Sequence, residues 1–242
     1  MRIPLIVIKS LITQKTFIEL ESEKKYLPGD IILKNKNGVF YCGNNILTVY
    51  TINEYKEQHL YPYFDQKNGT FIDIGAHAGK YSIKLGQNKL LKIIALEPDN
   101  YNFSLLIKNI ALNNLTNVIP INKGAFFKKD RIPFYLSDKG EGLHSIFRTN
   151  DKWQSTTIEV DALDNIVNDL NLSGKIGLIK IDVEGAEVEV LKGAEKIIEQ
   201  DHPNLIIEIL MENKQNLDTI INMLKIYNYR TLRLDKDNYF FS

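Results

Sequence analysis

The sequence predicts an α/β protein in which a mostly parallel sheet carries helices on both faces, with a β-rich elaboration ahead of it. From Thr70 onward, strand-like and helix-like segments alternate, which is typical of parallel strands joined by helices. The runs FIDI and KIIALE are almost continuously apolar, as strands buried on both faces should be. An apolar run ends at Asp73, a glycine-bearing turn follows, and Glu97 ends the next run, which is the outline of a nucleoside or nucleotide site.

We divide the chain into an elaboration, residues 1–66, and a ligand-binding domain, residues 67–242. In the elaboration, Asn37-Gly38 separates two β-type runs as a two-residue hairpin turn would, and residues 43–45 turn into a third strand. A helix capped by Asn53 then leans on the first central strand. Such a segment either covers a cofactor and contacts substrate or serves as structural padding.

The domain's elements follow in order. Strands are expected at residues 70–74, 92–97, 118–122, 177–182 and 204–210, and the tail forms an antiparallel hairpin. Helices with apolar faces connect them, and a further helix covers residues 162–170. The expected faces are Phe103, Leu106, Ile107, Ile110 and Ala111; Val190, Leu191, Ala194, Ile197 and Ile198; and Leu217, Ile220, Ile221 and Leu224.

An insertion around residues 128–160 interrupts the alternation. It contains short β segments separated by polar turns. Because ligands bind outside the carboxyl ends of strands in such sheets, an insertion before the fourth strand builds a substrate wall.

Composition limits the function. The chain has 242 residues with 30 basic and 30 acidic side chains, so attraction to nucleic acid or an anionic membrane is not indicated. One cysteine, Cys42, excludes an internal disulfide and fits a reducing, cytoplasmic location. No stretch reaches the roughly 18 apolar residues of a transmembrane segment. The sequence does not determine the oligomeric state.

The turn itself selects among ligands. Its glycines read Gly75-x-x-x-Gly79, which fails the G-x-G-x-x-G pattern of a dinucleotide site. A carboxylate at Asp73 repels a pyrophosphate but attracts the ammonium and sulfonium of S-adenosylmethionine, and Glu97 can accept hydrogen bonds from both ribose hydroxyls. The alternative is that the glycines only make a tight turn and the two acids cap helices.

Several longer motifs carry a family resemblance. FIDIGAHAGKYS, ALEPDNYNFSLLIKNIALNN, LIKIDVEGAEVEVLKGAEKII and HPNLIIEI together resemble the FkbM family of S-adenosylmethionine-dependent methyltransferases. The resemblance covers about residues 70–241, and IDVEGAE is its most specific part. It implies a Rossmann-like class I methyltransferase with a seven-stranded sheet and an antiparallel last strand. It also implies O-methylation of sugars, glycan intermediates or polyketide hydroxyls.

The resemblance places functional residues by position. Asp73, Gly75 and Gly79 line the methionine end of the cofactor, Glu97 the ribose, and Asp182 the floor facing the methyl group. His77 replaces the asparagine common in the family, which leaves only a backbone role there. The full expected cofactor set is Asp73, Gly75, Ala76, His77, Gly79, Glu97, Pro98, Asn122, Ala125 and Asp182, of which Asn122 and Ala125 flank the adenine.

An alcohol acceptor needs a base, because a neutral hydroxyl is a weak nucleophile. Asp182 is the first candidate, His144 of the insertion the second, and Glu184 a further carboxylate. Asp182, Glu184 and Glu208 could together hold Mg²⁺, which would acidify the hydroxyl. The alternative, which we favour, is that Glu184 and Glu187 stabilise the start of the next helix.

Three functions stay open at this point. The first is O-methylation of a sugar, glycan intermediate or similar polyhydroxylated small molecule. The second is methylation of an amine or a macromolecule, and the third is a non-catalytic module that binds a nucleoside.

Overall fold

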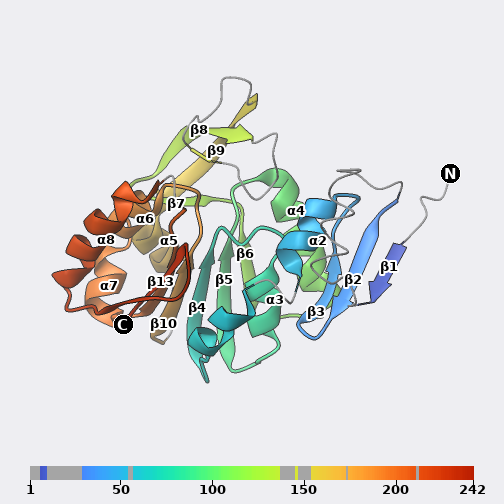
Figure 1. Ribbon diagram of the computed structural model, residues 1–242, viewed down its shortest axis with the longest axis horizontal. Coiled ribbons are helices and arrows are strands. Elements are labelled where there is room, and N and C mark those ends of the chain that lie inside the picture. Colours follow the sequence, from blue (N-terminus) through green and yellow to red (C-terminus); the bar gives the residue numbers. More distant parts are fainter. Residues whose placement is uncertain are drawn as a thin grey trace.

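The computed structural model describes residues 6–9, 29–53, 57–136, 145–146, 154–172, 174–210 and 213–242. Its centre is a seven-stranded sheet in the order β12-β13-β11-β10-β4-β5-β6 (Figure 1). The strands are β4 (Gly69–Ile74), β5 (Leu91–Leu96), β6 (Val118–Ile121), β10 (Ile176–Ile181), β11 (Asn204–Glu208), β12 (Thr231–Arg233) and β13 (Asn238–Phe241).

Five neighbouring strands of this sheet, from β6 to β11, run parallel to one another. The C-terminal strand β13 runs antiparallel to both of its neighbours, β11 and β12. The predicted α/β fold, its mostly parallel sheet and its antiparallel last strand are therefore confirmed.

Alternate residues of each strand face opposite sides of the sheet, and each side has its own core. Phe71, Ile93 and Leu178 face one core, which α3 (Lys80–Gly86) and α4 (Asn100–Leu112) cover. The residues immediately before and after these along each strand face the other core. Its helices are α5 (Leu163–Asp169), α6 (Glu187–Lys192), α7 (Glu195–Asp201) and α8 (Gln215–Lys225). Figure 1 shows the two helical layers with the sheet between them.

Helix α4 is rotated from its predicted orientation. Ile107 and Ala111, expected to be buried, are exposed, whereas Asn109 is completely buried. The Asn109 side chain accepts from the Tyr41 N–H at 2.6 Å and donates to the Ala78 carbonyl at 2.8 Å. Polar docking of the N-terminal hairpin therefore determines which face of α4 is buried, and apolar spacing alone does not reveal it.

The N-terminal elaboration forms a separate three-stranded sheet from β1 (Ile6–Lys9), β2 (Ile31–Asn35) and β3 (Gly38–Tyr41). The hairpin turn lies one residue earlier than predicted, because Asn35 pairs with Gly38 and its side chain accepts from the Asn37 N–H at 2.9 Å. Residues 36–37 are therefore the turn.

The third strand predicted after residues 43–45 is wrong, because this segment is helix α2 (Ile46–Ile52). The Asn45 side chain caps that helix by accepting from the Leu47 N–H at 2.9 Å. Asn53 ends α2 instead of starting the next helix, which is the 3₁₀ helix η1 (Gln58–Phe64). As predicted, this second helix packs against the first central strand, because the ring of Phe64 meets that of Phe71 edge-on, with the ring centroids 5.9 Å apart.

The insertion forms a second small sheet in the order β7-β9-β8. Its strands are β7 (Gly124–Phe126), β8 (Asp130–Leu136) and β9 (Gln154–Ala162), and β8 and β9 project beyond the central sheet in Figure 1. Ser145 adds an isolated bridge to Tyr135 of β8. None of the helices in the described part of the chain is long and apolar enough to cross a membrane.

Candidate functional site

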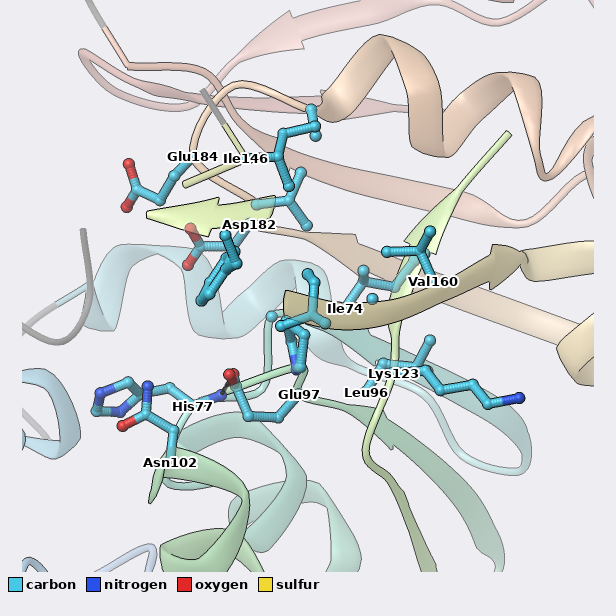
Figure 2. Close-up of a pocket in the computed structure, with 18 of the residues that line it drawn as sticks. Ile74, His77, Leu96, Glu97, Asn102, Lys123, Ile146, Val160, Asp182 and Glu184 are labelled. Carbon is cyan, nitrogen blue, oxygen red and sulfur yellow. Dashed lines mark hydrogen bonds between the residues drawn. The ribbon is translucent and has the colours of Figure 1, made fainter. Parts of the chain in front are cut away.

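A cavity of about 390 Å³ lies at the carboxyl ends of the central strands. Ile74, Leu96 and Asp182 mark the ends of β4, β5 and β10 in its lining. Figure 2 shows Glu97 with His77 along one side and Asp182 with Glu184 along the other. The cavity is thus where a sheet of this topology binds its ligand.

The glycine turn is fixed by main-chain contacts. The N–H groups of Gly75 and Ala76 both donate to the Leu96 carbonyl, at 3.0 and 2.9 Å. Gly75 has φ +79°, and a Cβ there would lie 1.8 Å from the Asp182 carbonyl oxygen. Glycine is therefore required because the turn presses against the end of β10.

Glu97 is a buried acid of the cavity that two backbone N–H groups hold in place. One carboxylate oxygen accepts from the His77 N–H at 2.8 Å (Figure 2), and the other accepts from the Asp99 N–H at 2.9 Å. Burial raises the pKa of Glu97 to about 8, although these two donors lower it. Each oxygen keeps a second acceptor site, so the carboxylate can also bind a pair of hydroxyls.

His77 takes part through its backbone. Its φ of +51° lies in the left-handed region, which aims the N–H at Glu97. The sequence assigned this position a backbone role only, and the hydrogen bond to Glu97 supplies one.

Asp73 does not line the cavity. Its side chain points toward α3, where one oxygen accepts from the Ser82 hydroxyl at 2.6 Å and from the Ser82 N–H at 3.1 Å. The other oxygen is buried without a hydrogen-bond partner in the described structure. Burial raises the pKa of this carboxyl above its ordinary value.

Six of the ten expected cofactor residues line the cavity and four do not. Gly75, His77, Glu97, Pro98, Ala125 and Asp182 belong to the lining; Asp73, Ala76, Gly79 and Asn122 lie outside it. Gly79 begins α3. Asn122 donates its side-chain N–H to the carbonyls of Glu97 and Pro98, at 2.9 and 3.3 Å, and so fixes the loop that presents Glu97.

The IDVEGAE segment forms the opposite wall. Glu184 has φ +54°, and its carbonyl accepts from the Ser145 hydroxyl at 2.7 Å. The buried Glu187 side chain accepts from the Gly185 N–H at 2.7 Å. Glu187 therefore closes the turn, while Glu184 and Asp182 face the cavity.

Two of the predicted catalytic residues, Asp182 and Glu184, line the cavity, and the third, His144, lies outside the described residues. Asp182 is paired with Lys180, whose Nζ lies 2.7 Å from its carboxylate. The structure does not group Asp182, Glu184 and Glu208 as ligands of a single magnesium ion. Nowhere in the described ranges are three or more His, Cys, Asp or Glu side chains grouped to hold a metal ion.

Sequence reasoning missed much of the lining. Leu47, Tyr50 and Thr51 of α2 reach the cavity, and so does Glu208 at the end of β11, which the sequence had suggested only as a magnesium ligand. The insertion adds an apolar wall, as its position before the fourth strand had indicated. That wall comprises Ile132, Phe134, Ile146, Ile158 and Val160.

Comparison with known proteins gives a consistent picture. The model of the methyltransferase FkbM domain matches residues 73–231. Methyltransferase sdnD of Sordaria araneosa is 25% identical over 204 residues, which cover 72% of this chain and 77% of the relative. Methyltransferase 1 of Beauveria bassiana is 24% identical over 160 residues, covering 58% and 63%.

Among solved structures, methyltransferase FkbM from Methylobacillus flagellatus superimposes with a TM-score of 0.52 at 22% identity. The match covers 73% of this chain but only 44% of that protein. The likeness at this identity supports the fold.

Proposed function

The chain belongs to the FkbM family of S-adenosylmethionine-dependent methyltransferases, and from that premise we propose that it methylates a hydroxyl of a sugar, glycan intermediate or similar polyhydroxylated small molecule. The methyl-group donor is the family's cofactor. The proposal of a hydroxyl acceptor depends on the geometry of the cavity.

The side chains that line the cavity are suited to binding S-adenosylmethionine. Glu97 presents a buried carboxylate with acceptor sites left for ribose hydroxyls. Leu96 and Pro98 beside it, with Ala125 across the loop, offer apolar surface for a base. Asp182 and Glu184 add negative charge suited to a ligand that carries an ammonium and a sulfonium.

When bound, S-adenosylmethionine supplies a methyl carbon activated by a sulfonium leaving group. The chain's own task is to hold the acceptor oxygen in line, exclude water and receive a proton. The apolar wall of the insertion and helix α2 enclose the cavity and limit water. Carboxylates at the ends of β10 and β11 face the same space and can receive the proton.

One observation carries the proposal of a hydroxyl acceptor: Asp182 and Glu208 lie at the ends of adjacent strands and both line the cavity. An amine nucleophile needs no such base once it is neutral, whereas an alcohol does. The aromatic side chains of Tyr50 and Phe134 offer faces on which the C–H surface of a sugar ring can pack.

The proposal is tested by measuring S-adenosylhomocysteine release with paired acceptors that differ in one group, such as glucose and glucosamine, across a panel of neutral glycosides and polyols. Turnover that requires a hydroxyl supports it. Turnover that follows the amine, or that occurs only with protein or RNA added, replaces it with the corresponding alternative. Tight cofactor binding without turnover on any acceptor favours a non-catalytic module.

A further inference from the structure

A row of charged side chains crosses three adjacent strands beside the cavity. Asp73 of β4 pairs in register with Lys180 of β10, and Ile181 of β10 pairs with Ile207 of β11. Asp182 and Glu208, one residue further along each strand, are therefore neighbours. The alternation of the strands places the whole row on the sheet face that α3 covers.

Lys180 forms an ion pair with Asp182. Its Nζ lies 2.7 Å from the Asp182 carboxylate, and its side chain is only 3% exposed. The ammonium also lies 5.1 Å from the centre of the Tyr81 ring. Burial lowers the pKa of Lys180, but the surrounding carboxylates, Asp182 foremost, raise it above its ordinary value, so the lysine stays charged.

The Asp182 side chain is 29% exposed, and its carboxylate compensates the charge of the buried Lys180 ammonium, which holds it in place. Glu208 is in a different position. Among the described residues it forms no ion pair with a cation; its carboxyl group is hydrogen-bonded to Asp182, beside which it lines the cavity.

The charges around Glu208 come from two elements. Asp182 and Lys180 face it from β10, and Glu57 faces it from the start of η1. Negative charge on Asp182, together with burial, raises the pKa of Glu208 well above its ordinary value, while Lys180 lowers it. Glu208 thus holds a proton more strongly than an ordinary carboxylate, and a stronger base removes a hydroxyl proton more effectively.

We propose that Glu208 takes the proton from the acceptor hydroxyl, and that Asp182, held by Lys180, is its positioning partner. This inference rests on the proposed function. The acceptor oxygen forms its bond to the methyl carbon as its proton passes to the Glu208 carboxylate. The carbon–sulfur bond breaks, its electron pair stays on sulfur, and the sulfonium charge is lost as Glu208 becomes neutral. Glu208 then returns its proton to solvent when the product leaves.

The first test needs no acceptor. The carboxyl carbons of Glu208 and Asp182 are titrated by NMR in the full-length protein, with E208Q and D182N assigning the two signals. We expect Glu208 to titrate far above the ordinary range of a glutamate. In D182N its titration should move to lower pH, because the neighbouring negative charge is gone and Lys180 becomes free to pair with it. Ionisation of Glu208 below pH 5 in the wild-type protein overturns the inference.

The second test is the pH dependence of turnover with the most active acceptor of the panel. Because the base must be ionised, kcat should fall as the pH drops through the pKa of Glu208. E208Q should lower kcat at least about 100-fold and should abolish this decrease of kcat at low pH, with little change in the cofactor Kd. E208D should recover part of the rate. In D182N, kcat should still fall at low pH, but the fall should begin at a lower pH than in the wild-type protein.

If D182N abolishes turnover while E208Q only shifts the pH at which kcat falls, the base is Asp182 and the inference is contradicted. A preference for amine acceptors would instead contradict the proposed function, whatever the two variants do. The NMR titration still decides the protonation of Glu208 in that case, so the two failures are distinguishable.

Discussion

The two halves of the cavity are built in different ways. The half that we propose for the cofactor centres on residues 75–98, where the Gly75 N–H donates to the Leu96 carbonyl and the His77 N–H to the Glu97 side chain. The acceptor half is assembled from α2, the insertion and the end of β11, and most of its contacts are apolar. Main-chain geometry accepts few substitutions, whereas an apolar wall accepts many of similar size. The contrast separates a half that fixes the chemistry from a half that can change the acceptor.

The largest effect is expected at the turn. G75A places a Cβ 1.8 Å from the Asp182 carbonyl oxygen at a φ of +79°, so it should destabilise the protein by more than about 3 kcal/mol or prevent folding. The matched control is G174A, where φ is +99° but no atom lies within 4 Å of the added Cβ. It should cost about 1 kcal/mol. Chemical denaturation measures both, and equal losses would show that the contact with β10 does not matter.

A smaller effect is expected at Glu97. Above pH 8, where Glu97 is ionised, E97A should raise the Kd of S-adenosylhomocysteine about tenfold or more, because it removes charge-assisted hydrogen bonds. E97Q should not rescue binding, since both oxygens accept backbone N–H groups and an amide would turn its own N–H₂ toward one of them. E159A, at an exposed position of β9, is the control for calorimetry. Unchanged affinity in E97A would remove Glu97 from the ribose site.

The smallest effect is expected in the acceptor half. Y50A removes an aromatic side chain of α2 from the cavity and should raise the acceptor KM about fivefold while leaving the cofactor Kd within about twofold. L90A, at a residue 74% exposed and outside the lining, should change neither constant. A loss of cofactor affinity in Y50A equal to the loss for acceptor would erase the distinction between the two halves.

The same contrast explains what the sequence could predict. The parallel strands, the glycine turn and Glu97 are local patterns, and each appeared where predicted. Helix α2 was missed because ILTVYTI is rich in β-branched residues, and the Asn45 cap and burial of the segment override that propensity. The sequence grouped Glu208 with Asp182 only as a possible magnesium ligand, whereas its position in the cavity follows from the pairing of β10 with β11.

The misplaced face of α4 has the same origin. Asn109 looks like a solvent-facing residue in the sequence, but it is buried because it satisfies the backbone of Tyr41 and Ala78. Partners far away in the chain decided each of these positions. Apolar periodicity reports none of them, whereas it located both cores of the sheet.

The most direct measurement is a crystal structure of the protein with S-adenosylhomocysteine. The account predicts that the ribose hydroxyls lie within hydrogen-bonding distance of Glu97, with the sulfur directed toward Asp182 and Glu208 and open space beyond it between α2 and the β8–β9 wall. A nucleoside bound away from Glu97, or a sulfur directed away from those two carboxylates, would contradict it.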